Sequence, residues 1–175
     1  MINLLWRGIK KLALGFLRLI FKILHKELTP EKEEGFIQFV KFGLVGLSNT
    51  VISYLTYVIF LFLFENAGIF PEWDYLIAQA IAFVTSVAWS FYWNNKYVFK
   101  EEEGEKRNIF LALIKTYVSY AFTGLFLNSI LSYLWVDVLH WSKLIAPIIN
   151  LLVSVPVNFF LNKLWAFRSK KKECE

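Results

Sequence analysis

Four long apolar tracts constrain the fold of this chain more than any other feature of its sequence. They cover residues 42–64, about 75–93, about 116–136 and about 144–165, and only Lys163 is charged within them. A helix of about 20 residues crosses a hydrocarbon core of about 30 Å, whereas a spanning strand is roughly half as long and alternates apolar with polar residues. The tracts therefore predict an all-α integral membrane protein with four transmembrane helices.

The composition excludes other classes of protein. Apolar residues make up 57% of the 175 residues and charged residues 19%, with a mean hydropathy of +0.49. The chain is too apolar to be disordered, and a water-soluble domain of 20.6 kDa could not bury so much apolar surface. Two histidines and one cysteine are too few for a transition-metal site. We therefore expect no metal, no cofactor and no catalytic residue.

Lysine and arginine residues lie almost entirely on one side of the predicted spans. Eighteen of the 19 precede the first span, lie between the second and third, or lie at or after the end of the fourth, and Lys143 alone is on the other side. Because cytoplasmic loops are enriched in lysine and arginine, both termini and the central loop are predicted to be cytoplasmic. The chain is expected to be a multi-pass plasma-membrane protein with residues 169–175 as a charged tail. The net charge of +5 is then a topology signal and does not indicate a nucleic-acid partner.

The N-terminal segment, residues 1–35, has a different pattern. Within residues 2–28, basic residues such as Lys10 and Arg18 share one face of a helical wheel, and apolar residues such as Leu12 and Phe16 share the other. This pattern predicts an amphipathic helix in the inner headgroup layer, in contact with anionic phospholipids. A docking surface for a partner protein is the alternative. Residues 29–35 (TPEKEEG) predict a turn into the first span.

The ends of the second and fourth spans match each other at an offset of 68 residues. Residues 86–100 align with residues 154–168 without a gap, and five positions are identical. The identical residues are Ser86, Val87, Phe91, Asn94 and Phe99, which align with Ser154, Val155, Phe159, Asn162 and Phe167. We interpret the chain as a duplicated two-helix hairpin. Two spans return the chain to its starting side, so the halves form a parallel repeat.

Polar side chains form a stripe along several of the spans. In the fourth span they recur every four residues and therefore share one helix face. The candidates are Asn49, Ser90, Asn94, Asn150, Ser154, Asn158 and Asn162. Two interpretations stay open: hydrogen bonds between neighbouring helices, or a path that offers donors and acceptors to the hydroxyl groups of a sugar.

Four cations lie at the predicted cytoplasmic ends of the helices, where they could bind the phosphate of an inner-leaflet lipid. They are Lys41, Lys96, Lys163 and Arg168. The alternative is that they extend to the membrane surface and only enforce topology. Trp165 belongs to the interfacial aromatic belt or stacks on a sugar ring.

Three motifs, in this order, resemble those of the GtrA-like family of small four-helix membrane proteins. They are residues 39–46 (FVKFGLVG), residues 90–99 (SFYWNNKYVF) and residues 158–167 (NFFLNKLWAF). The resemblance covers about residues 36–168 and leaves the amphipathic segment outside. The middle motif departs from the last one, because Asn95 aligns with Lys163 and its lysine follows at Lys96.

The resemblance implies a function that the residues alone do not specify. Such proteins are thought to flip a polyprenyl-phosphate-linked monosaccharide from the inner to the outer leaflet, where it decorates a cell-surface polysaccharide or teichoic acid. Some relatives are instead described as adaptors that recruit the glycosyltransferase that makes this lipid. The resemblance therefore implies a non-enzymatic protein with a lipid-linked sugar and membrane glycosyltransferases as partners. Assembly into a homo-oligomer is left open.

Overall fold

The computed structural model describes residues 2–69, 71–101, 105–142 and 145–171. The α-helices are α1 (Ile2–Ile23), α2 (Pro30–Ala67), α3 (Asp74–Trp93), α4 (Ile109–Ala121), α5 (Asn128–Tyr133) and α6 (Ala146–Leu161). Several of them continue as π-helical segments, which are η1 (Asn94–Val98), η2 (Phe122–Leu127), η3 (Leu134–Val138) and η4 (Asn162–Ala166). The two-residue strands β1 (Glu105–Lys106) and β2 (Lys170–Lys171) form an antiparallel pair.

Within the described residues, four helical stretches are long and apolar enough to cross a membrane. They are Pro30–Ala67, Asp74–Val98, Ile109–Val138 and Ile148–Ala166. Each overlaps one of the tracts predicted from the sequence, so the all-α membrane class and the four predicted spans are confirmed.

The first span begins earlier than predicted, and the turn expected over residues 29–35 is wrong. Thr29 has an extended backbone (φ −82°, ψ 154°), Pro30 is the first helical residue, and Glu31 and Glu33 lie in the first turn. Proline loses no hydrogen bond at this position, and acidic side chains interact favourably with the positive end of the helix dipole. The charged run therefore starts α2 instead of interrupting it.

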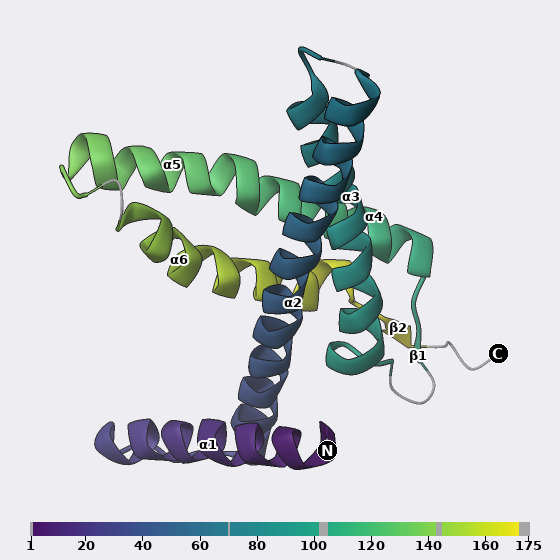
Figure 1. The fold of residues 1–175 in the computed structure, drawn as a ribbon. Coiled ribbons are helices and arrows are strands. Elements are labelled where there is room, and N and C mark those ends of the chain that lie inside the picture. The colour runs from purple at the N-terminus through teal and green to yellow at the C-terminus, as the bar shows by residue number, and fades with distance from the viewer. Residues whose placement is uncertain (1, 70, 102–104, 143–144, 172–175) are drawn as a thin grey trace.

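Helix α1 lies across the beginning of α2 (Figure 1). Arg18 Nε donates a hydrogen bond to Glu33 Oε1 at 2.8 Å, and Leu17 is buried. Leu12 and Phe16 remain exposed on α1. The expected N-terminal helix is therefore observed, and its position in the headgroup layer stays a prediction.

The four spans form two hairpins that cross each other. Helix α2 pairs with α3, and the stretch from α4 through α5 pairs with α6 (Figure 1). Gln38 Nε2 at the start of the first hairpin donates to Val98 O at its end (2.9 Å). In the second hairpin, Lys115 Nζ donates to Trp165 O (3.3 Å). The beginning of each hairpin thus lies beside its own end.

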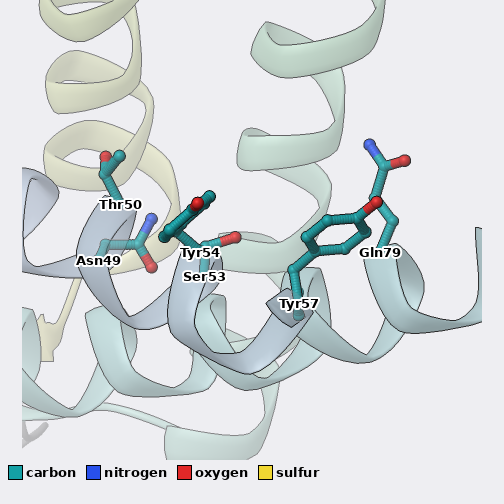
Figure 2. A pocket seen from close by; sticks show the side chains of 7 residues that line it. Asn49, Thr50, Ser53, Tyr54, Tyr57 and Gln79 are labelled. Carbon is teal, nitrogen blue, oxygen red and sulfur yellow. The ribbon is translucent and has the colours of Figure 1, made fainter. Parts of the chain in front are cut away.

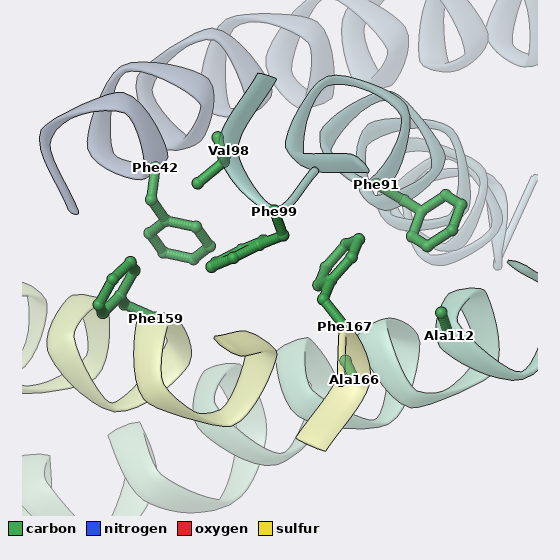
Figure 3. Close-up of a cluster of buried hydrophobic side chains, with 8 residues drawn as sticks. All are labelled: Phe42, Phe91, Val98, Phe99, Ala112, Phe159, Ala166 and Phe167. Atoms are coloured by element: carbon green, nitrogen blue, oxygen red, sulfur yellow. The ribbon is translucent and has the colours of Figure 1, made fainter. Parts of the chain in front are cut away.

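The hairpins meet at a cluster of buried side chains (Figure 3). Phe99 and Phe167 stack at its centre, with ring centroids 4.8 Å apart. Phe91 lies 5.4 Å from Phe167, and Phe159 lies 5.8 Å from Phe99. At the offset of 68 residues, Phe91 is equivalent to Phe159 and Phe99 is equivalent to Phe167. The contact of Phe91 with Phe167 is therefore the counterpart of the contact of Phe159 with Phe99, as in two copies related by a two-fold axis. The geometry supports the hypothesis of a duplicated hairpin.

The segments η1 and η4 end in the same way. The Phe99 N–H donates to Asn94 O at 2.8 Å, and the Phe167 N–H donates to Asn162 O at 2.8 Å. Both asparagine side chains are fully buried. Each helix therefore widens by one residue at its last turn and directs a phenylalanine into the shared cluster. We use the term basic end for this end of the bundle, where η1 and η4 terminate and Lys163 lies.

Candidate functional site: a cation pocket and an amide groove

Arg107 links the two hairpins at the basic end. Its Nη1 donates to Phe167 O at 2.8 Å, and its Nη2 donates to Phe99 O at 3.0 Å and to Asn95 Oδ1. The side chain is only 3% exposed, with Nε 3.9 Å from Glu101 Oε1. One guanidinium thus satisfies the carbonyl that follows each π-helical segment. Nothing in the sequence separates this arginine from the charges that set topology.

Lys41 of α2 and Lys163 of η4 line one pocket at the basic end, with a volume of about 310 Å³. Glu31, Glu34 and Gln38 line it as well. Among the ion pairs of the described residues, none joins either lysine to these glutamates. Both ammonium groups are therefore available to an anion. We refer to this site as the cation pocket.

Aromatic rings hold the two lysines in place. Lys41 Nζ lies 5.6 Å from the ring centroid of Trp6, and Lys163 Nζ lies 5.6 Å from that of Phe159. Both side chains are half-buried. Cation–π contacts of this kind strengthen as water is excluded, so the two half-buried lysines are held in position with part of their hydration removed.

The other predicted cations are not among the residues that line this pocket. Lys96 is exposed, and its Nζ donates to Tyr92 Oη at 3.2 Å. Arg168 is exposed as well. Trp165 is 42% exposed, and Lys115 Nζ lies over the Trp165 ring, 5.4 Å from the ring centroid. The structure therefore brings together two of the four predicted phosphate ligands.

A second cavity, of about 630 Å³, runs along α2 between the two hairpins. Most of its lining is apolar, but amide and hydroxyl side chains contribute as well: Asn49, Thr50, Tyr120, Thr123, Asn128, Ser154 and Asn158. The Oδ1 atoms of Asn49, Asn128 and Asn158 are buried and accept no hydrogen bond within the described part of the chain. Leaving such an acceptor unpaired costs about 1–3 kcal/mol, so these side chains gain from a shift that lets them accept hydrogen bonds from a ligand in the cavity. We refer to this cavity as the amide groove.

Glycines leave the wall of the amide groove open. Gly43, Gly46 and Gly124 line it, and a Cβ built on any of the three would meet no atom within 4 Å. The groove therefore has room beside the backbone at all three positions. The sequence motif FVKFGLVG contains two of these glycines, but their contribution to a cavity is visible only in the structure.

The cation pocket and the amide groove share two helices. On α2, Asn49 follows Lys41 by eight residues, which corresponds to about 12 Å along the axis. On the helix formed by α6 and η4, Asn158 precedes Lys163 by five residues. The cations thus lie at one end of the stripe of unpaired amide oxygens.

Asn150 of the predicted polar path is fully hydrogen-bonded. Its Oδ1 accepts from Trp135 Nε1 at 3.0 Å, and its Nδ2 donates to Ser132 Oγ at 2.7 Å and to Asn128 O at 3.3 Å. These bonds join α6 to the opposite helix of its hairpin. The interpretation as an interhelical contact fits this residue.

Three further residues of that path are buried at the basic end. Asn94 Nδ2 donates to Ser90 Oγ at 3.1 Å, and Ser90 Oγ is hydrogen-bonded to Tyr120 Oη at 2.7 Å. Asn162 Nδ2 donates to Asn158 O at 2.8 Å. Tyr120 reaches the amide groove, whereas Ser90, Asn94 and Asn162 have no exposed surface.

The fold and the site define a small multi-pass helical membrane protein with a groove between two hairpins that carries amide and hydroxyl groups on a mostly apolar lining. Residues 41–167 match the model of the GtrA/DPMS transmembrane domain, and the chain belongs to this family. The resemblance seen in the sequence motifs is therefore confirmed.

The chain is also similar to a protein described as a dolichol-phosphate mannosyltransferase of Pyrococcus furiosus. The two are 32% identical over 151 residues, which cover 84% of this chain and 39% of that protein. The chain thus spans about two-fifths of the length of this curated relative. No solved structure matches the chain.

Proposed function

We propose that the chain flips a polyprenyl-phosphate-linked monosaccharide from the inner to the outer leaflet of the plasma membrane, for glycosylation of a cell-surface polysaccharide or teichoic acid. One observation carries this proposal: the cation pocket and the amide groove lie on the same two helices. Family membership and the mannosyltransferase relative support a lipid-linked sugar as the substrate class.

In this proposal the cation pocket binds the phosphate of the lipid head group, and the amide groove binds its sugar. Lys41 and Lys163 attract the phosphate, because hydrogen bonds to a charged group contribute about 1.5–3 kcal/mol when the partners are partly desolvated. The sugar hydroxyls donate to the unpaired oxygens of Asn49, Asn128 and Asn158. The prenyl chain stays in the lipid beside exposed apolar residues of α2.

A reconstitution experiment tests the proposal. Vesicles containing undecaprenyl-phosphate-linked glucose with a radiolabelled sugar are prepared with and without the purified chain, and impermeant periodate is added outside. We expect the chain to expose the inner-leaflet lipid to oxidation without any nucleotide. Oxidation that stops at the outer-leaflet fraction, as in protein-free vesicles, would show that the chain is not a flippase for this lipid.

A second candidate function is recruitment of a glycosyltransferase. It is favoured by helix α1, which carries basic residues and exposes Leu12 and Phe16. Deletion of residues 2–28 separates the two functions. If recruitment is the function, the intact chain does not flip the lipid and the deletion abolishes binding of the glycosyltransferase. If flipping is the function, the deletion leaves most of it intact, because the cation pocket and the amide groove lie outside residues 2–28.

We also propose that the chain itself transfers no sugar and that the hairpins form a parallel repeat. In addition, we propose that both termini face the cytoplasm. The proximity of Lys41, Arg107 and Lys163 at the basic end supports this orientation. Impermeant maleimide should reach Cys174 only from the cytoplasmic side, and a cysteine introduced as Glu72→Cys only from outside. The opposite labelling would invert the topology.

A further inference from the structure

A second polar groove lies between α2 and α3, further along α2 from the basic end than the amide groove (Figure 2). Its volume is about 450 Å³, within the roughly 300–1,000 Å³ of small-molecule sites. Its lining residues are Asn49, Thr50, Ser53, Tyr54, Tyr57, Gln79 and Ala82. Of these residues, Asn49 alone is a site candidate from the sequence, because the tyrosines and Gln79 form no stripe of their own.

The lining is polar but uncharged. Every lining residue except Ala82 carries an amide or hydroxyl group, and the Tyr57 side chain points toward Gln79 in Figure 2. Thr50 Oγ1 is bonded to Gly46 O at 3.2 Å, whereas Asn49 Oδ1 is buried without a partner. Polar groups facing hydrocarbon are costly unless they are paired, so this groove requires a partner that offers hydrogen bonds without charge.

The position of the groove along α2 separates it from the cation pocket. Tyr57 follows Lys41 by 16 residues, which corresponds to about 24 Å of the roughly 30 Å hydrocarbon core. Gln79 lies five residues after the beginning of α3, at the end opposite the basic end. The groove therefore extends along α2 from about 12 Å to about 24 Å beyond Lys41, away from the lysines.

From this arrangement we infer that the groove between α2 and α3 is a second sugar site, which holds the uncharged sugar of the lipid on the outer side before release. This inference rests on the proposed flipping function and orientation. Asn49 and Thr50 line both grooves, so the two grooves meet at polar side chains that a sugar can contact as it passes from one to the other. Tyr54 and Tyr57 add aromatic faces for the apolar side of the sugar ring.

Protection of an engineered cysteine tests the site without any transport assay. In a Cys174→Ser background, Tyr54→Cys places a thiol in the groove, and Leu55→Cys places one on the opposite side of α2 at the same depth. The chain is held in nanodiscs, and maleimide labelling is measured with decyl glucoside, decyl mannoside or decyl phosphate, each below its micelle concentration. A thiol reacts as its thiolate, so labelling also reports access of water.

We expect Tyr54→Cys to be labelled much faster than Leu55→Cys. A decyl glycoside at twice its Kd should slow the Tyr54→Cys reaction by roughly threefold, because protection scales as one plus the ratio of ligand to Kd. Decyl phosphate should give no protection, since the groove has no cation. Gln79→Leu should abolish the protection, and Thr85→Val, a change about 120° around α3 at a residue that does not line the groove, should preserve it.

Three results would overturn the inference. Equal labelling of the two thiols would show a groove filled by lipid, and labelling that no glycoside slows would show a groove that binds no sugar. Disulfide-linked dimers of Tyr54→Cys would show that a second copy covers it. Because the readout is protection, glycoside binding without lipid flipping would reject the proposed function alone, and flipping without protection would reject only this site.

Discussion

Asn150 and Asn158 project from the same helix two turns apart, and they differ in whether their carboxamide oxygens are paired. Asn150 Oδ1 accepts a hydrogen bond from Trp135, whereas Asn158 Oδ1 is buried without a partner beside the amide groove. One residue thus has its interactions within the protein, and the other retains an acceptor for a ligand.

Leucine substitutions should separate these roles. Asn158→Leu should lower the affinity for the lipid-linked sugar by about tenfold, the equivalent of one hydrogen bond of about 1.4 kcal/mol, with normal thermal stability. Asn150→Leu should instead destabilise the fold by about 1 kcal/mol, because Trp135 Nε1 and Ser132 lose their partner. Lipid binding and thermal unfolding of both purified variants measure this. Equal loss of stability would assign Asn158 to helix packing.

Lys163 should contribute to phosphate binding in a way that a general topology charge does not. We expect Lys163→Gln to reduce the affinity for the lipid-linked sugar by about tenfold or more, and Lys41→Gln to act similarly. Lys171→Gln, in the basic tail, is the matched control and should have little effect. Binding measured in nanodiscs of neutral lipid removes the contribution of anionic phospholipids. If the three variants bind equally, the cation pocket is not the phosphate site.

Glu34 provides a test of opposite sign in the same pocket. Its carboxylate lines the cation pocket with Lys41 and Lys163 and repels a phosphate placed there. Glu34→Gln should therefore raise the affinity for the lipid by a few-fold, and added salt should reduce the difference from wild type. Glu72→Gln, near the beginning of α3, serves as the control. Weaker binding of Glu34→Gln would indicate that this carboxylate orients a lysine.

Gly46 allows the amide groove to be blocked without disturbing its wall. A Cβ at this position meets no atom within 4 Å, so alanine should be tolerated, whereas leucine would extend into the cavity. Gly46→Leu should stop flipping almost completely and leave the thermal stability within about 1 kcal/mol of wild type. Gly46→Ala should retain most of the rate. A fully active leucine variant would place the path elsewhere.

The four spans, the α1 helix and the equivalence of residues 68 apart could be predicted because each depends on a local pattern. Long apolar tracts have few alternatives to a membrane helix, and matching end sequences gave matching π-helical ends. The beginning of α2 was missed because a charged run containing proline indicates a turn in most contexts, while Thr29 and Pro30 here make it a helix start.

The site was harder to predict because it depends on which side chains line the groove once the two hairpins are packed together. Asn158 and Asn162 belong to the same stripe, yet Asn162 is fully buried behind it. The pattern could show that both share a helix face, but not that the opposite hairpin covers one of them. Arg107 and Gln79 belong to no periodic pattern, and their positions become meaningful only once distant segments are packed together.

The hydrogen bonds of Arg107 determine how the two hairpins can move. The guanidinium fixes the carbonyls of Phe99 and Phe167 to each other at the basic end. A change in the crossing angle would therefore leave the phenylalanine stack in place and appear as a displacement of the far loops. Spin labels at Glu72→Cys and His140→Cys should report broad distances that narrow with bound lipid, whereas a pair near the basic end should report one fixed distance. The two hairpins would then rotate relative to each other about a hinge at the basic end.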